Sequence, residues 1–220
     1  MTDFPKYCSD SDGTILPESF YLDTDVLHIA QKLLGKVIVT NIAGIRCKAR
    51  IVETEAYRAP EDQASHAKNN TRTTRTEIMY ARGGHIYVYL CYGIHHLFNI
   101  VTGPKDVPHA VLIRGVEPVE NADIMLRRRK QKVVHPQLTA GPGVLSKALG
   151  IRTYHSGLYL HHPYSPIRIE EGDTPLPKGC IQSSTRVGID YSGDWAFKPW
   201  RYFIKDNSYV SQAKGASISA

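Results

Sequence analysis

The chain has 220 residues, of which 42% are hydrophobic and 22% are charged. This length and composition are typical of one globular domain with a sizeable core, and no stretch is long and apolar enough to cross a membrane as a helix. The net charge of +6 favours an anionic partner, and by itself it leaves nucleic acid and a membrane surface equally open.

The cysteines and the N-terminus indicate the cellular environment. Cys8, Cys47, Cys91 and Cys180 are widely separated and include no Cys-x-x-Cys pair, and residues 1–17 contain no apolar segment typical of a secretory leader. We therefore expect reduced thiols in a soluble intracellular protein, which is cytoplasmic if the source is bacterial and nuclear if it is eukaryotic.

The first half of the chain predicts one helix, two strands and a long loop. Residues 1–16 are polar and predict a loosely ordered lead-in. Apolar residues then recur at helical spacing up to Gly35, and alternating strands and a polar functional loop follow. The expected elements are a helix over Asp25–Leu34, strands over Lys36–Thr40 and Ile45–Glu55, and the loop over Arg58–Glu77.

The second half is richer in strands. The expected strands are His85–Cys91, His96–Thr102, Ala110–Val116, Leu158–His161, Ile167–Glu170 and Trp200–Ile204, and the expected helices are Val119–Lys132 and Val144–Leu149. Together with the first half, this predicts a mixed α+β fold: a single domain over residues 17–210 with a curved, mainly antiparallel, open-barrel-like sheet and peripheral helices. Residues 211–220 are small and polar, and we expect them to fray.

Two carboxylates end the second predicted strand on its apolar face. If the alternation of Ile45–Ile51 continues, Glu53 and Glu55 both point toward the core. A buried carboxylate needs a partner or a function, so it is either a helix cap or ion pair, or a general base at the mouth of a pocket. Arg114 projects from the apolar face of its own strand and is a candidate to hold such a base ionised, or to form a purely structural ion pair.

The segment His85–Gly93 presents a tyrosine-rich strand face that includes Tyr87 and Tyr89. Tyr92 breaks the alternation just before Gly93, so it stands on a turn at the end of the strand. A rigid aromatic side chain on a hairpin tip suits insertion between stacked bases, whereas aromatic strand faces are also common in ordinary cores. Both interpretations remain open at this point.

Eight motifs follow one another along the chain. They are LLGKVIV (Leu33–Val39), IVETEAY (Ile51–Tyr57), PEDQASH (Pro60–His66), YVYLCYG (Tyr87–Gly93), the strand around Asn99, VLIRGVEP (Val111–Pro118), GPG with LSKAL (Gly141–Leu149), and RVGIDYSGDWAFKPWRYF (Arg186–Phe203). Each motif alone is weak evidence. In this order and separation, they resemble the alkyladenine (3-methyladenine) DNA glycosylase family over a stretch from Leu22 to Ser211.

The resemblance implies a monofunctional DNA glycosylase that starts base excision repair. Such an enzyme flips an alkylated or deaminated purine, of the 3-methyladenine, 7-methylguanine, hypoxanthine or ethenoadenine type, out of duplex DNA and hydrolyses its N-glycosidic bond. The implied partner is double-stranded DNA with a damaged purine, and the resemblance implies no cofactor. We expect a monomer with no metal site and no membrane partner.

The resemblance also implies a role for each matching residue. Glu55 would activate the attacking water, and Arg114 would hold this water and the phosphate of the flipped nucleotide. The remaining implied roles are sandwiching of the extruded base by Tyr57 and His66, closure of the pocket edge by Tyr89, exclusion of guanine by Asn99, and intercalation into the DNA stack by Tyr92.

The sequence departs from the better-known vertebrate pattern near the intercalating residue. Ile94 replaces a methionine and is followed by His95 and His96, and Arg58 replaces a leucine after Tyr57 and is a candidate phosphate contact. These changes bear on the preferred lesion and on the grip on DNA. They leave the catalytic roles in place.

Other classes of function remain as alternatives. A non-catalytic binder of distorted DNA would keep the aromatic wedge, but it has no use for the pair Glu55 and Arg114. An RNA-modifying enzyme or nucleoside hydrolase leaves Tyr92 without a stack to enter. A lyase needs a lysine nucleophile at the base position, and a metal site needs ligand spacings that the ten histidines lack. The turn Gly141–Gly143 is either a phosphate-binding helix start or a plain turn.

Overall fold

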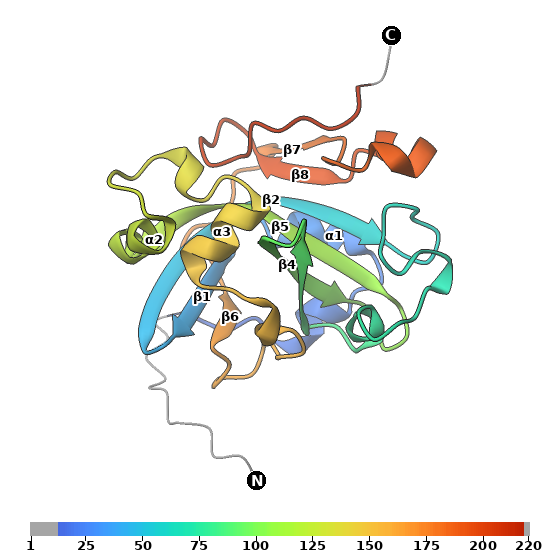
Figure 1. Cartoon of the computed structure of the whole chain (residues 1–220), viewed down its shortest axis with the longest axis horizontal. Coiled ribbons are helices and arrows are strands. Elements are labelled where there is room, and N and C mark those ends of the chain that lie inside the picture. The colour runs from blue at the N-terminus through green and yellow to red at the C-terminus, as the bar shows by residue number, and fades with distance from the viewer. Residues whose placement is uncertain (1–12, 218–220) are drawn as a thin grey trace.

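The computed structural model describes residues 13–217, which form one antiparallel sheet of eight strands with helices packed around it (Figure 1). The strands are β1 (Val37–Ile42), β2 (Ile45–Arg58), β3 (Ile86–Cys91), β4 (His95–Thr102), β5 (His109–Glu120), β6 (Ile167–Glu170), β7 (Ile181–Ser184) and β8 (Arg201–Ile204). The α-helices are α1 (Val26–Lys32), α2 (Ala122–Arg129) and α3 (Pro142–Leu149). The 3₁₀ helices are η1 (Glu18–Leu22), η2 (Lys68–Asn70), η3 (Glu77–Tyr80), η4 (Pro136–Leu138), η5 (Thr153–His155) and η6 (Asp190–Phe197). The predicted mixed α+β fold with a large antiparallel, open sheet is confirmed.

The long strand β2 is the centre of the sheet. The strand order is β3-β4-β5-β2-β1-β6, and β8 pairs with both β2 and β7. Along one edge, β2 pairs first with β1 over residues 45–50 and then with β8 over residues 53–55, while β5 follows its other edge. Residues 53–55 therefore lie where three strands meet, and their backbone is covered on both sides.

A double irregularity interrupts the ladder between β2 and β5 at this point. Ile51 pairs with Val116 and Glu53 with Gly115, but Thr54 then pairs with Ile113. Val52 and Arg114 are left without a Cα partner, one on each strand. Such bulges redirect the side chains around them, and here the redirected side chain on β5 is that of Arg114.

The core lies between the sheet and the helices. Helix α1 begins where the Asp25 carboxylate accepts hydrogen bonds from the amides of Leu27 and His28, which satisfies two free donors of its first turn. Its last turn is tied to β2, because the Thr54 hydroxyl donates to the carbonyl of Ala30 at 2.9 Å. Fully buried side chains of the core include Ile29, Leu33, Ile38, Ile51, Phe98, Ile100 and Ile113. The stretch of β2 that carries the two carboxylates is therefore held rigidly from behind.

Two predicted elements differ from the structure. The helix expected over Val119–Lys132 is shorter, because β5 continues through Glu120 and the left-handed residues Asn121 and Lys130 bound α2. The strand expected over Leu158–His161 does not form, since its only ladder contact is an isolated bridge between Tyr159 and His85. In contrast, β7 had no clear alternating pattern in the sequence and pairs with β8 alone.

The C-terminal segment 211–220, which was expected to fray, makes contacts in its described part. The carbonyl of Ser211 accepts a hydrogen bond from Arg201 at 2.9 Å and the carbonyl of Ala216 accepts one from the Thr185 hydroxyl at 2.9 Å. Of the lead-in expected over residues 1–16, residues 1–12 lie outside the described part of the chain. No helix within residues 13–217 is long and apolar enough to span a bilayer.

Candidate active site

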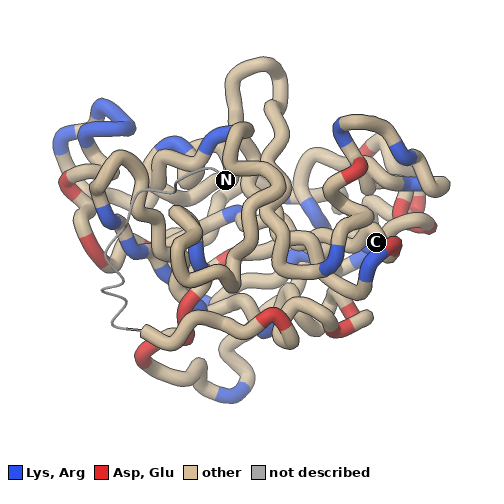
Figure 2. The backbone as a smooth tube through the Cα atoms, turned by 90° about the horizontal axis from the view of Figure 1, so that it is seen from below, with Lys and Arg blue, Asp and Glu red and all other residues tan. Residues whose placement is uncertain are grey.

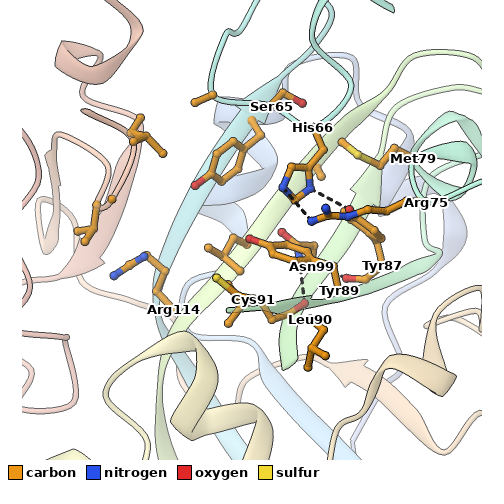
Figure 3. A pocket seen from close by; sticks show the side chains of 18 of the residues that line it. Ser65, His66, Arg75, Met79, Tyr87, Tyr89, Leu90, Cys91, Asn99 and Arg114 are labelled. Carbon is orange, nitrogen blue, oxygen red and sulfur yellow. Dashed lines mark hydrogen bonds between the residues drawn. The ribbon is translucent and has the colours of Figure 1, made fainter. Parts of the chain in front are cut away.

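A cavity of about 410 Å³ opens beside β2, β3 and β5, and Figure 3 shows His66, Tyr89, Asn99 and Arg114 in its wall. Six of the seven predicted site residues line it, namely Tyr57, His66, Tyr89, Tyr92, Asn99 and Arg114, whereas Glu55 does not. They come from four separate parts of the chain, namely β2, the loop after it, the β3–β4 hairpin and β5. The fold therefore gathers into one place the residues that were singled out far apart in the sequence.

Glu55 lies directly behind the wall of this cavity and is fully buried. Its Oε2 accepts a hydrogen bond from the Tyr57 hydroxyl at 2.8 Å, and its Oε1 accepts one from the amide of Val187 at 2.7 Å. Nη1 of Arg114 lies 3.4 Å from the same Oε1. Two donors and one cation thus stabilise the negative charge of this carboxylate, while Tyr57, Val187 and Arg114 also line the cavity.

Arg114 connects the two carboxylates of β2. Its Nε donates to Oε1 of Glu53 at 3.0 Å, while its Nη1 faces Glu55. Burial opposes the charge of this guanidinium, but the carboxylates of Glu55 and Glu53 outweigh burial and raise the pKa of Arg114. Arg114 is therefore a permanent cation at the cavity wall.

Glu53 has a different environment, although it is equally buried. Its oxygens accept from Nε of Arg201 at 2.7 Å, from the Ser211 amide at 2.7 Å and from the Ser211 hydroxyl at 2.8 Å, in addition to Arg114. It does not line the cavity. The sequence placed both carboxylates on the core side, and the structure confirms this burial. Neither carboxylate lines the cavity itself, but the three partners of Glu55 do, namely Tyr57, Val187 and Arg114.

The wall opposite Glu55 is aromatic. The Tyr87 hydroxyl lies 2.8 Å from Nδ1 of His66, and the rings of His66 and Tyr89 meet edge to face with centroids 4.5 Å apart. Burial, with a smaller contribution from the cation Arg75, lowers the pKa of His66 to about 4. The imidazole is therefore neutral near pH 7, and the wall offers flat, uncharged ring faces on which a planar ligand can stack.

Asn99 is fixed in the wall of the cavity. Its Nδ2 donates to the carbonyls of Leu97 at 3.1 Å and of Tyr87 at 3.3 Å, and the residue is buried. Because both bonds anchor the amide to the backbone of β3 and β4, the side chain is held in one position. A rigid amide of this kind can sort ligands by the shape and polarity of their edge.

Tyr92 stands at the tip of the β3–β4 hairpin and is 91% exposed. The turn closes with a hydrogen bond from the Ile94 amide to the Cys91 carbonyl, and both central residues are left-handed, with φ of 50° at Tyr92 and 73° at Gly93. A tyrosine in this backbone region is strained. Ile94 is also 70% exposed, so the tip presents apolar side chains to solvent.

Arg186, for which no role was predicted, supports the site from behind. Its guanidinium is fully buried, pairs with both carboxylate oxygens of Asp62, and lies between the rings of Tyr57 and Trp200, 4.7 Å and 5.1 Å from their centroids. The next residue, Val187, donates to Glu55. Arg186 and Asp62 each lie within a motif quoted above, but nothing in the spacing of two distant motifs indicated that they pair.

Two predicted roles outside the cavity have a different outcome. The Arg58 guanidinium, expected as a phosphate contact, lies 5.1 Å from the centroid of the Trp200 ring and 2.8 Å from the Glu61 carboxylate. The turn Gly141–Gly143 packs against the hairpin, since a Cβ on Gly143 would come within 2.7 Å of the His95 ring.

Within residues 13–217, no three His, Cys, Asp or Glu side chains are grouped to hold a metal ion.

Comparison with known proteins agrees with this geometry. Residues 19–208 match the family described as methylpurine-DNA glycosylase. A protein of Chlamydia abortus named "Putative 3-methyladenine DNA glycosylase" is 46% identical over 191 residues, which cover 86% of this chain and 98% of that protein. A protein of the same name from Bacillus cereus (strain G9842) is 40% identical over 202 residues, covering 89% of this chain and 98% of that protein.

The chain therefore belongs to the methylpurine-DNA glycosylase family. It is a DNA-repair hydrolase of N-glycosyl bonds, and DNA is its substrate. The resemblance drawn from the eight motifs is confirmed.

Proposed function

We propose that this protein flips alkylated and deaminated purines out of duplex DNA and hydrolyses their bond to deoxyribose, leaving an abasic site. The observation that carries the proposal is the buried carboxylate of Glu55, which lies directly behind Tyr57 and Arg114 in the wall of an aromatic cavity, with an exposed tyrosine at the nearby hairpin tip. A non-catalytic DNA binder has no need for a buried carboxylate at this place. We propose that the protein works in the compartment that holds the DNA. This is the cytoplasm if the source is a bacterium and the nucleus if it is a eukaryote.

The proposed chemistry begins with water held at Glu55. The carboxylate accepts a proton from this water as it attacks the anomeric carbon of the sugar, and the negative charge stabilises the positive charge that develops on the sugar ring. Arg114 lies 3.4 Å from Glu55 and is positioned to contact the phosphate of the flipped nucleotide. The bond between the anomeric carbon and the purine nitrogen breaks with its electron pair on the purine, so a base alkylated at N3 or N7 departs neutral, and a deaminated base takes up a proton from solvent as it departs.

The aromatic residues of the proposed mechanism offset the cost of extruding the base. Unstacking a base costs a few kcal/mol, and stacking on protein rings returns about 1–3 kcal/mol per base. Tyr57 and His66 supply these ring faces, Tyr89 closes the edge, and Tyr92 fills the gap in the DNA stack. Asn99 excludes guanine by crowding its exocyclic amine.

The charge distribution supports binding to a DNA backbone. Figure 2 shows Lys and Arg over much of the molecule, densest on the left at the basic end of α2, with Asp and Glu among them on the right. The dense basic group suits contact with the phosphates of a duplex. We propose that the protein does this as a monomer, without a cofactor.

The test is single-turnover excision from a DNA duplex that carries one hypoxanthine or one ethenoadenine, with alkali used to reveal abasic sites. The unaltered protein should release the base, and Glu55→Gln should bind the duplex but leave the base attached. Glu171→Gln is the matched control, since Glu171 forms a surface ion pair with Lys36. Near-normal release by Glu55→Gln would overturn the proposed mechanism. Borohydride should trap no protein–DNA adduct, because hydrolysis by water forms no Schiff base.

A further inference from the structure

Arg75 reaches the wall of the cavity from the loop after β2, although no role has been given to it so far. Its Nη2 lies 3.2 Å from Nε2 of His66, and its guanidinium lies 5.1 Å from the centroid of the Tyr89 ring. Figure 3 shows the side chain extending along the cavity beside His66, Tyr87 and Tyr89. Arg75 therefore contacts the imidazole of His66 directly, from the side of the cavity wall.

The chemistry of arginine fixes the direction of the hydrogen bond between Arg75 and His66. A guanidinium has N–H donors and no acceptor, so Nε2 of His66 accepts this bond through its lone pair. A hydrogen on Nε2 would instead place two N–H groups against each other beside a positive charge. The position of the Arg75 guanidinium therefore favours a bare Nε2.

The other ring nitrogen of His66 faces a hydroxyl, which can donate or accept. Nδ1 lies 2.8 Å from the Tyr87 hydroxyl oxygen. Burial and, to a smaller extent, the charge of Arg75 lower the pKa of His66 to about 4, so near pH 7 the imidazole is neutral and carries a single N–H. Because Arg75 occupies the lone pair of Nε2, this hydrogen lies on Nδ1 and is donated to Tyr87.

We propose that Arg75 is a positioning residue, which fixes the imidazole of His66 as its Nδ1–H tautomer and in a single orientation. A ring turned over by half a turn would put carbon atoms where the two nitrogens now make their hydrogen bonds, so the contacts with Arg75 and Tyr87 select one orientation. With both nitrogens engaged, His66 offers a base its ring face and no free N–H.

This inference rests on the proposed function in one respect only. The task of His66 toward a flipped base follows from that function, whereas the tautomer is a property of the free protein. The two can therefore be tested separately.

Arg72 provides a matched comparison within the same loop. Its guanidinium lies 4.6 Å from the centroid of the Tyr80 ring, but its N–H groups bond to two carboxylates instead of a histidine. Arg72 and Arg75 are both exposed, so substitution of either should leave the fold intact. A difference between variants at the two positions reports the contact with His66 and not the loss of a surface charge.

The first experiment uses long-range proton–nitrogen correlation spectra of the free protein with isotope-labelled histidines, which identify the protonated ring nitrogen. His66→Phe lacks the signals of His66 and so assigns them. At pH 7 the unaltered protein should carry its hydrogen on Nδ1. Arg75→Met keeps an unbranched side chain without a donor, and it should raise the ratio of the Nε2–H to the Nδ1–H tautomer about tenfold. Arg72→Met should leave this ratio unchanged.

The second experiment is a double-mutant cycle on single-turnover excision of one hypoxanthine from a duplex. Arg75→Met should slow excision by about fivefold, because the ring of His66 is then free to turn away from the stacking position. In the His66→Phe background the same substitution should change the rate by less than about twofold, since no ring nitrogen remains for Arg75 to hold.

A hydrogen on Nε2 in the unaltered protein overturns the inference, and so does a tautomer ratio that Arg75→Met changes by less than about twofold. Equal effects of Arg75→Met on excision in both backgrounds, or no effect in either, would also overturn it, because Arg75 would not act through His66. If the unaltered protein releases no base, the proposed function fails, and the spectra of the free protein still decide the tautomer. Circular dichroism of each variant reports whether the fold is kept.

Discussion

Two carboxylates on one strand, two residues apart and both fully buried, have opposite surroundings in this protein. Glu53 is surrounded by two arginines, a backbone amide and a hydroxyl, all at hydrogen-bond distance. Glu55 accepts from one hydroxyl and one amide, shares Arg114 with Glu53, and lies behind the wall of a cavity that these three partners line. The two carboxylates differ in where their partners lie. Partners enclose the carboxylate of Glu53, whereas every partner of the Glu55 carboxylate also lines the cavity.

The comparison shows that burial alone does not indicate a catalytic carboxylate. A buried charge enclosed by cations and donors fixes the structure around it, and breaking it leaves its partners uncompensated. A buried charge next to an open cavity can transfer a proton to or from a molecule that enters. Four substitutions test whether Glu53 has the structural role and Glu55 the role in proton transfer.

The largest effect is expected from Glu55→Gln. The rate of base excision should fall by about a thousandfold, because the amide cannot accept the proton of the attacking water. The free energy of unfolding should change little, since Arg114 keeps Glu53 as its counter-ion. Single-turnover kinetics and urea denaturation of the same preparation measure the two quantities. A rate loss smaller than about tenfold would place the base elsewhere.

Glu53→Gln should show the reverse pattern. It leaves Arg114 and Arg201 with less negative charge in the interior, so the free energy of unfolding should fall by about 3 kcal/mol. Urea denaturation measures this, with Glu171→Gln on the surface as the control, for which about 0–1 kcal/mol is expected. Equal losses in the two variants would contradict the structural role of Glu53.

Tyr57→Phe tests the role of the hydrogen bond that the Tyr57 hydroxyl donates to Glu55. It keeps the ring for stacking but removes the hydroxyl that donates to Oε2, so excision should slow by about tenfold while binding of damaged DNA is unchanged. Tyr80→Phe is the control, because its hydroxyl bonds only to the carbonyl of Thr71. Slower excision that arises entirely from weaker binding would mean that the hydroxyl acts on the base rather than on Glu55.

The smallest expected effect is a change in how the free energy of unfolding depends on pH. It arises from His66, which lines the cavity. The folded pKa of His66 is about 4, below its ordinary value of 6.5, because of burial and then of Arg75. Between these values the unfolded chain binds a proton that the folded chain does not, so stability falls as the pH drops from about 6.5 to about 4.

Between pH 7 and pH 5, the unaltered protein should therefore lose about 1 kcal/mol more of its unfolding free energy than His66→Gln does. Urea titrations at the two pH values give this difference. Identical losses in both proteins would show that His66 titrates normally in the folded state.

Local sequence patterns were sufficient for most of the strands and for the burial of both carboxylates. Alternation is a property of a single strand, so β2 and β3 could be predicted from their own residues. The double bulge at Val52 and Arg114 depends on how two strands far apart in the sequence are aligned, and no pattern within either strand encodes it. That alignment is what turns Arg114 between the two carboxylates.

The residues that the sequence did not reveal act through contacts made by distant segments. Arg186 and Asp62 form their ion pair across 124 residues of chain, and Ser211 looked like part of a polar tail. Arg75 was visible only as one of several basic residues in a polar loop, and its position against His66 depends on how that loop folds back. The motif resemblance nevertheless singled out six residues that line the cavity, and their roles remain predictions.

The bond between the Ser211 amide and Glu53 joins residues 158 positions apart in the chain. During synthesis on the ribosome, β2 emerges long before β8 and the segment that carries Ser211. Until those residues leave the exit tunnel, Glu53 lacks Arg201 and Ser211, and a low-polarity core cannot close over its charge without them. The protein can therefore complete its central sheet only after residue 211 has been synthesised, and nascent chains that stop before residue 201 should remain open and accessible to chaperones and proteases.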